Sequence, residues 1–235
     1  MRRTLAIFGL GWLAPAVVAG HIAYAAPAQT STIPKLPAAR PGQPALQPSP
    51  PPPATVQLPS IDLSAVPEPC KPLAKQATAP SVSAALSARI SLASCMADHA
   101  IAPLALCDCG ASIAEVDAAA APALRVLDDV IAVGDPATQV VAEHTEGELY
   151  AGFATRLLGT LPRVAPGASD AEVALRDMRK QTLDAQLGPW REAAMTSFQH
   201  VVDIAKAHPE LANNPVVTTA VRDSQRRLAA DVAAR

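Results

Sequence analysis

The chain has 235 residues, of which 50% are hydrophobic, 17% are charged and only 3% are aromatic. This composition excludes a collagen-like or fully disordered chain, but it leaves few bulky side chains for a large core. The formal net charge is −2, and from Ser81 onward 13 basic residues stand against 19 acidic ones, a net charge of −6. A nucleic-acid-binding role is disfavoured, because contact with phosphate requires a surplus of Lys and Arg.

The first 25 residues have the pattern of a secretory signal peptide. Arg2 and Arg3 supply a positive start, residues 5–20 are apolar, and residues 23–25 read Ala-Tyr-Ala, an A-x-A cleavage site. A retained membrane anchor is the alternative, because the apolar character continues past the cleavage site and approaches the roughly 20 residues that span a bilayer. We therefore expect a periplasmic or secreted protein, with a membrane contact only if this segment is kept.

Proline is concentrated in the next part of the chain. Fifteen of the 24 prolines lie between Pro27 and Pro80, and residues 50–53 are all proline. Proline fixes φ and lacks a backbone donor, so this composition predicts an extended, polyproline-II-rich segment. We interpret residues 26–80 as a disordered Pro-rich linker and residues 81–235 as the folded domain. A stalk, or a ligand for a Pro-binding partner, is the alternative for the linker.

Four cysteines, Cys70, Cys95, Cys107 and Cys109, form an even set. In an oxidising compartment an even set predicts two disulfides, with three possible connectivities. A one-residue spacer forces a small ring, so Cys107 and Cys109 are each expected to bond to Cys70 or Cys95 instead of to each other. A redox-active pair or a thiolate metal site is the alternative, but the chain has no C-x-x-C spacing to support it.

Beyond Pro80, apolar residues recur at spacings of three and four, which predicts helices and no strands. Breaker and capping residues, including a capping box at residues 169–172, divide this pattern into six segments. Pro122 predicts a kink or a break in the second segment. The predicted helices cover about residues 82–101, 112–133, 136–161, 170–187, 189–208 and 216–234.

The fold class predicted from these segments is all-α, a disulfide-stapled bundle of five or six helices behind the Pro-rich disordered tail. Each helix has an apolar stripe that we expect to face the core. For the last three helices the clearest members of these stripes are Ala171, Ala174, Leu175 and Met178, then Trp190, Phe198, Val201 and Val202, then Val217, Val221, Leu228 and Val232.

The most polar helical segment contains the candidate site. His144 and Glu148 are four residues apart and share a helix face, a spacing that can supply two metal ligands or an acid–base pair. The segment has no H-E-x-x-H motif, so a third ligand would have to come from another helix. The candidates for that third ligand are His99 with Asp98, or His200 with Asp203.

Gly147 and Gly152 in the same segment offer a different explanation. Glycine lowers helix propensity by roughly 1 kcal/mol relative to Ala, and inside a helix it often marks a close contact with another helix. We favour a solvated acidic face that another helix crosses at the two glycines, over a metal site.

The function expected from the sequence is that of an exported, non-catalytic helical module on a Pro-rich tether. It would act through contacts with a protein or cell-envelope partner, without a cofactor. One alternative is a metal-binding protein or metal-dependent enzyme that uses His144 and Glu148. The other is a small-molecule carrier with a cavity between its helices.

Overall fold

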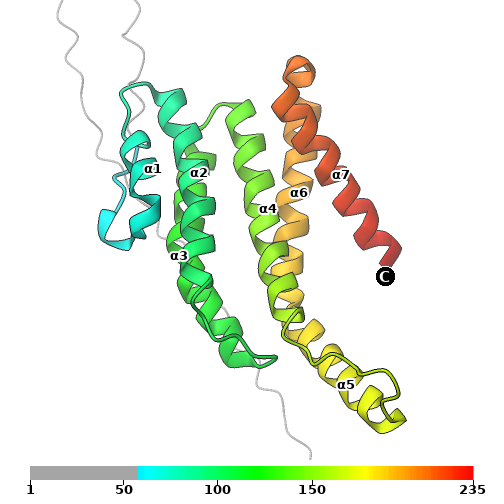
Figure 1. Cartoon of the computed structure of the whole chain (residues 1–235). Coiled ribbons are helices and arrows are strands. Elements are labelled where there is room, and N and C mark those ends of the chain that lie inside the picture. Colours follow the sequence, from blue (N-terminus) through cyan, green and yellow to red (C-terminus); the bar gives the residue numbers. More distant parts are fainter. Residues whose placement is uncertain (1–57, 235) are drawn as a thin grey trace, which may run out of the picture. The chain divides into compact units, whose positions relative to one another are not determined.

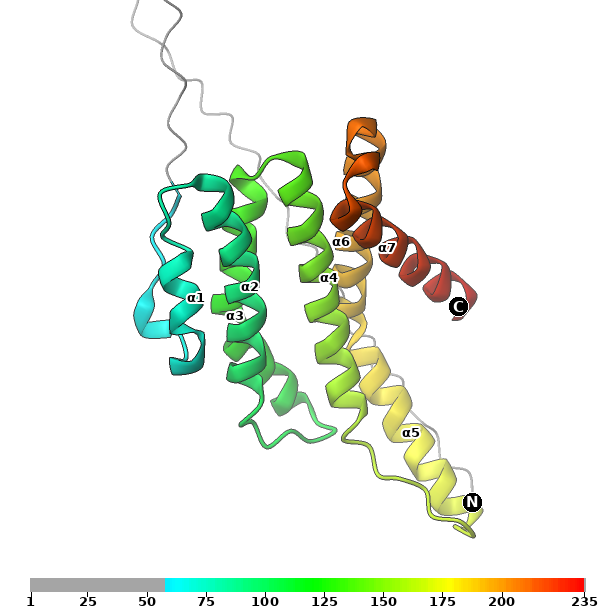
Figure 2. The ribbon, with the colours of Figure 1, turned by 45° about the horizontal axis from the view of Figure 1, so that its top comes forward.

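The computed structural model describes residues 58–234, which lie within the compact unit Pro53–Arg235. The predicted signal peptide and most of the predicted linker lie outside these residues. The described part contains seven α-helices, three short 3₁₀ helices and no strand, which confirms the all-α prediction for it (Figures 1 and 2). None of the helices in residues 58–234 combines the length and the hydropathy of a membrane span.

The folded part begins before Pro80, which corrects the predicted extent of the linker. Two 3₁₀ helices, η1 (Leu63–Ala65) and η2 (Glu68–Cys70), precede helix α1 (Lys71–Gln76). The prolines here do not prevent helix formation, because Pro69 and Pro72 occupy first-turn positions, where the missing N–H has no partner to lose. The segment is folded onto the protein by small buried side chains, Val66, Cys70, Ala74 and Ala77.

The six helices predicted after Pro80 are all present. They are α2 (Val82–Ile101), α3 (Gly110–Val133), α4 (Pro136–Leu158), α5 (Asp170–Gln186), α6 (Gly188–Ala207) and α7 (Pro215–Ala234), with the 3₁₀ helix η3 (Pro209–Asn213) before α7. Asp135 caps α4 by accepting from the Thr138 N–H at 2.8 Å, and Ser169 with Glu172 forms the predicted capping box of α5. Helix α3 continues through Pro122 without a break.

Helix α4 is packed on several sides. It contacts α3 and α2 on one side and α6 and α7 on the other (Figure 1). The larger buried cluster spans α1 to α4, Leu183 of α5 and the start of α6, and there Phe153 and Trp190 meet edge to face with ring centroids 5.8 Å apart. A smaller cluster joins α4, α6 and α7 and consists of Val140, Val201, Val217 and Ala220. Because α4 contributes to both clusters, its polar side chains lie between packed helices.

Helix α5 has a different environment. In both views it extends away from the other helices, and it packs against only a small part of α4 and α6. Leu183 is the one buried side chain among its described residues. The predicted core-facing stripe of α5 is wrong, because Leu175 is 51% exposed and Met178 is 63% exposed. The predicted core-facing stripe is also wrong at the far end of α7, where Val232 is 75% exposed.

Candidate functional site

The candidate site lies on α4, whose polar residues face two different neighbours. His144 and Glu148 contact α7, while Glu143 and Glu146 contact α6. The helical repeat explains the division, because residues four apart share a face and adjacent residues are turned by about 100°. The predicted pairing of His144 with Glu148 on one face is therefore present, and a second polar face lies beside it.

Glu148 is held by an ion pair with α7. Its carboxylate accepts hydrogen bonds from Nε and Nη2 of Arg227 at 3.0 and 2.6 Å. His144 Nδ1 lies 3.2 Å from the hydroxyl of Ser224, and its ring centroid is 5.9 Å from that of Phe198. Burial lowers the pKa of His144, against the opposing effect of Glu148. A lowered pKa favours the neutral imidazole, which is the form that binds a metal ion.

The structure does not bring the predicted third ligands to His144 and Glu148. His200 lies against Glu143 on the other face of α4, and Asp98 pairs with Arg156 at 2.5 Å. The acidic residue that shares a surface pocket with His144 and Glu148 is Asp223 of α7, which sequence reasoning did not select. It is paired with Arg226. Within residues 58–234 these side chains do not lie close enough together to surround one ion.

The second polar face of α4 contains two carboxyl groups turned toward α6. Glu143 Oε1 lies 3.2 Å from His200 Nδ1, and the Ser197 hydroxyl donates to Glu146 Oε2 at 3.2 Å. Burial raises the pKa of both glutamates, and the charge of Glu143 raises that of Glu146 further. The predicted solvated acidic face is wrong here, since Glu143 is only 7% exposed.

The burial of Glu143 follows from the helix crossing at Gly147, one turn further along the same face. A Cβ at Gly147 would lie 2.6 Å from the Phe198 ring, so only glycine admits the close approach of α6. This confirms the predicted crossing at Gly147. The prediction fails at Gly152, where a Cβ would meet nothing within 4 Å. The i, i+4 relation of Glu143 to Gly147 was the sequence signal that the glutamate would be covered.

The cysteines form two disulfides, as predicted, but with a different connectivity. Cys70 bonds to Cys95 with Cα atoms 5.8 Å apart, and Cys107 bonds to Cys109 with Cα atoms 5.3 Å apart. The packing of η2 against α2 places Cys70 on Cys95, which leaves the two cysteines of the α2–α3 loop with each other. Two disulfides are consistent with an oxidising compartment outside the cytoplasm.

A different group of potential metal ligands includes the first disulfide. Ligand atoms of Cys70, Cys95 and His99 all lie within 4.8 Å of one another, the one such group of three in the described part of the chain. Cys95 and His99 are four residues apart on α2, which is the spacing that sequence reasoning noticed for His144 and Glu148. It was missed at Cys95 because a thiolate metal site was judged only by the absence of C-x-x-C spacing.

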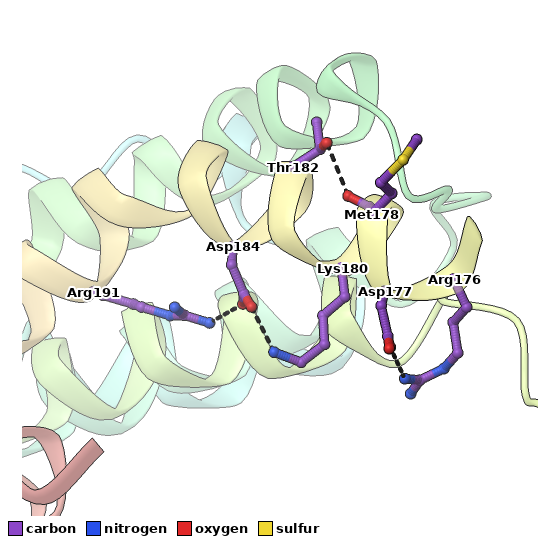
Figure 3. Close-up of polar contacts among 7 residues, drawn as sticks. All are labelled: Arg176, Asp177, Met178, Lys180, Thr182, Asp184 and Arg191. Atoms are coloured by element: carbon purple, nitrogen blue, oxygen red, sulfur yellow. Dashed lines mark hydrogen bonds and ion pairs between the residues drawn. The ribbon is translucent and has the colours of Figure 1, made fainter. Parts of the chain in front are cut away.

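Helix α5 and the loop before it form a surface groove with a volume of about 480 Å³. Its walls include Val164 and Leu175, together with three arginines and one glutamate. Figure 3 shows that Met178 and Thr182 lie on one side of α5 and its ion-paired residues on the other. The charged residues that line the groove are Arg163, Arg176, Arg179 and Glu172.

Comparisons with protein-family models, with curated proteins and with solved structures gave no match to this chain.

Proposed function

We propose that this chain is an exported, non-catalytic helical module that binds a protein partner through α5 and is held on a Pro-rich tether. The observation that carries the proposal is the exposed apolar stripe of α5. Its residues share one side of the helix, and none of them is buried: Ala171, Ala174, Leu175 and Met178. A contiguous apolar surface of this kind is typical of an interaction site.

The charge beside the stripe indicates the chemistry of the partner. The domain is acidic as a whole, yet the groove next to Leu175 contains three arginines and one glutamate. Arg163 forms no ion pair within residues 58–234, and Arg176 and Arg179 form contacts of 3.4 and 3.6 Å with Asp177 and Asp108. An amphipathic helix with an apolar face and flanking carboxylates would complement both features.

Helix α5 is also pre-organised for binding. Its capping box is complete, and Asp184 accepts from both Lys180 at 2.6 Å and Arg191 at 2.5 Å (Figure 3). These contacts lie away from the apolar stripe, so they hold the helix without covering the surface. A partner would therefore bind a helix that is already ordered, so the free energy of binding would not include the entropy lost when a helix forms.

The test uses a synthetic amphipathic helical peptide with leucines at i, i+3 and i+7 and glutamates on its flanks. We expect fluorescence anisotropy to show binding to the full chain that weakens as salt is added. Leu175→Glu with Met178→Glu should lower the affinity at least about tenfold, because both changes place charge in the apolar contact. The matched control is Val173→Glu, the same kind of change at an exposed apolar residue on the opposite side of α5, which should leave binding within about twofold.

Two comparison ligands decide between partner classes. The same peptide with lysines in place of the glutamates should bind at least about tenfold more weakly. Equal binding of the two peptides, or no binding of either, would overturn the proposal. Binding of vesicles of anionic phospholipid that is lost in the Leu175→Glu, Met178→Glu variant would instead assign α5 to the cell envelope.

A metal site at His144 is the second candidate, favoured by the position of Asp223. One imidazole and two carboxylates line the same pocket, but they would have to move closer together to bind one ion, and Glu148 is paired with Arg227. Zinc bound to the oxidised protein and lost in the variant His144→Ala would support this function. Failure of the oxidised protein to retain zinc would eliminate it.

A further inference from the structure

We infer that reduction of the Cys70–Cys95 disulfide creates a binding site for a thiophilic divalent cation, with zinc as the representative ion and His99 as the third ligand. The residues involved belong to η2 and α2, and the site stands independently of the proposed function. It gives the disulfide a second role besides linking η2 to α2.

The geometry places three zinc-type ligands together. The sulfur atoms of Cys70 and Cys95 and one ring nitrogen of His99 lie within 4.8 Å of one another. Two thiolates bound to one tetrahedral zinc, at about 2.3 Å each, have sulfurs about 3.7 Å apart. The Cα separation of 5.8 Å permits this arrangement as well as the disulfide, so the backbone need not move far between the two states.

The surroundings suit a cation that keeps one open position. His99 is exposed and lies in the last turn of α2, where the helix dipole favours positive charge. Cys95 is half-buried, while Cys70 is fully buried. Three protein ligands with the fourth position toward solvent is the arrangement of zinc sites that exchange a ligand. The Cys107–Cys109 disulfide has no comparable group of ligands within the described residues.

The chemical step requires a reductant, which we take to be a dithiol. A thiolate of the reductant attacks Cys95 Sγ, the accessible sulfur, and the S–S bond breaks with Cys70 as the leaving thiolate. The second thiol of the reductant then releases Cys95, so two electrons and two protons pass to the protein and the reductant becomes a disulfide. Zinc binding displaces both thiol protons and forms two Zn–S bonds and one Zn–N bond.

The experiment titrates zinc into the full chain before and after reduction with a phosphine. The background is the variant Cys107→Ser, Cys109→Ser, which removes the other cysteine pair. We expect one zinc per chain after reduction and none before it. Cobalt in place of zinc should give the near-ultraviolet charge-transfer absorption of a thiolate ligand. His99→Gln should lower the zinc affinity at least about tenfold, and Cys70→Ser should abolish one-to-one binding.

Two controls test whether zinc binds at this group of ligands and whether the variant protein stays folded. His208→Gln removes a histidine that belongs to neither group of candidate ligands and should leave the zinc affinity of the reduced protein unchanged. His99→Gln leaves the disulfide and the core intact, and circular dichroism of its oxidised form should match that of the parent protein. Zinc binding with unchanged affinity in His99→Gln, no binding after reduction, or loss of helicity that zinc does not restore would each overturn the inference.

Discussion

Helices α4 and α5 begin with equally strong local signals but differ in what covers them. Each has a capping residue that accepts from a backbone N–H three residues later, Asp135 for α4 and Ser169 for α5. Helix α4 is then packed by α3, α6 and α7, whereas α5 buries one side chain, Leu183. The start of a helix is a local property of the sequence, but the burial of its face depends on the remaining helices.

The polar residues of α4 and α5 also differ in their partners. On α4, His144, Glu143 and Glu146 are fixed by contacts with neighbouring helices. On α5, the charged residues pair mainly with residues of the same helix or the next one, and the apolar stripe is uncovered. The polar side chains of α4 therefore contribute to the packing of the bundle, whereas the apolar stripe of α5 stays exposed.

The largest expected contrast is between Phe198 and Met178. Phe198 is fully buried against α4, and its replacement by Ala should lower the free energy of unfolding by about 3–5 kcal/mol. Met178→Ala should change it by less than about 0.5 kcal/mol, because that side chain is 63% exposed. Urea unfolding followed by circular dichroism measures both. A loss above about 2 kcal/mol for Met178→Ala would show that the stripe is covered in the isolated protein.

A smaller contrast is expected between two glycines of α4. Gly147→Ala should lower the free energy of unfolding by about 1–2 kcal/mol, because overlap with Phe198 outweighs the gain in helix propensity. Gly152→Ala should raise it by up to about 1 kcal/mol, since its Cβ would meet no atom within 4 Å. Thermal unfolding of the two variants gives the sign directly. Stabilisation by Gly147→Ala would mean that α6 does not approach α4 closely.

The sequence was sufficient to locate α2 to α7, because proline, glycine and capping residues act over three or four positions. It was not sufficient for α1, where Pro69 and Pro72 were counted as evidence of extended chain although a first-turn proline is compatible with a helix. The disulfide connectivity was also missed, since it depends on the packing of η2 against α2. The short spacer between Cys107 and Cys109 did not prevent their bond, and the packing of the elements determined which cysteines pair.

At the candidate site, the sequence predicted the shared face of His144 and Glu148 but not their partners. Arg227 and Ser224 lie about eighty residues further along the chain, and no local pattern connects them to α4. The close crossing at Gly147 was predicted, yet its consequence for Glu143 was not drawn. Long-range contacts of this kind are set by helix packing, which a single sequence indicates only through the small residues that permit it.

The smallest expected effect tests the charge buried between α4 and α6. Burial raises the pKa of Glu146 above the ordinary value of about 4.3, so its folded form binds a proton more tightly than its unfolded form. Its contribution to stability is therefore greatest at low pH and falls as pH rises from about 4.3 through the raised value. Glu146→Gln removes the charge but keeps an oxygen that accepts from Ser197. At pH 7 we expect a gain of about 0.5 kcal/mol, reduced by the partial exposure of the group.

The pH dependence of the difference between Glu146→Gln and the parent protein is the informative measurement. His144 has the opposite sign, because burial lowers its pKa and stability is lost as pH falls below its ordinary value of about 6.5. Its contribution is common to both proteins and cancels in the difference. The gain from Glu146→Gln should be present at pH 7 and vanish toward pH 4. The control Glu148→Gln breaks the pair with Arg227 and should cost less than about 1 kcal/mol. A gain from Glu146→Gln that persists at pH 4 would show that shape, and not charge, limits the packing of α4 on α6.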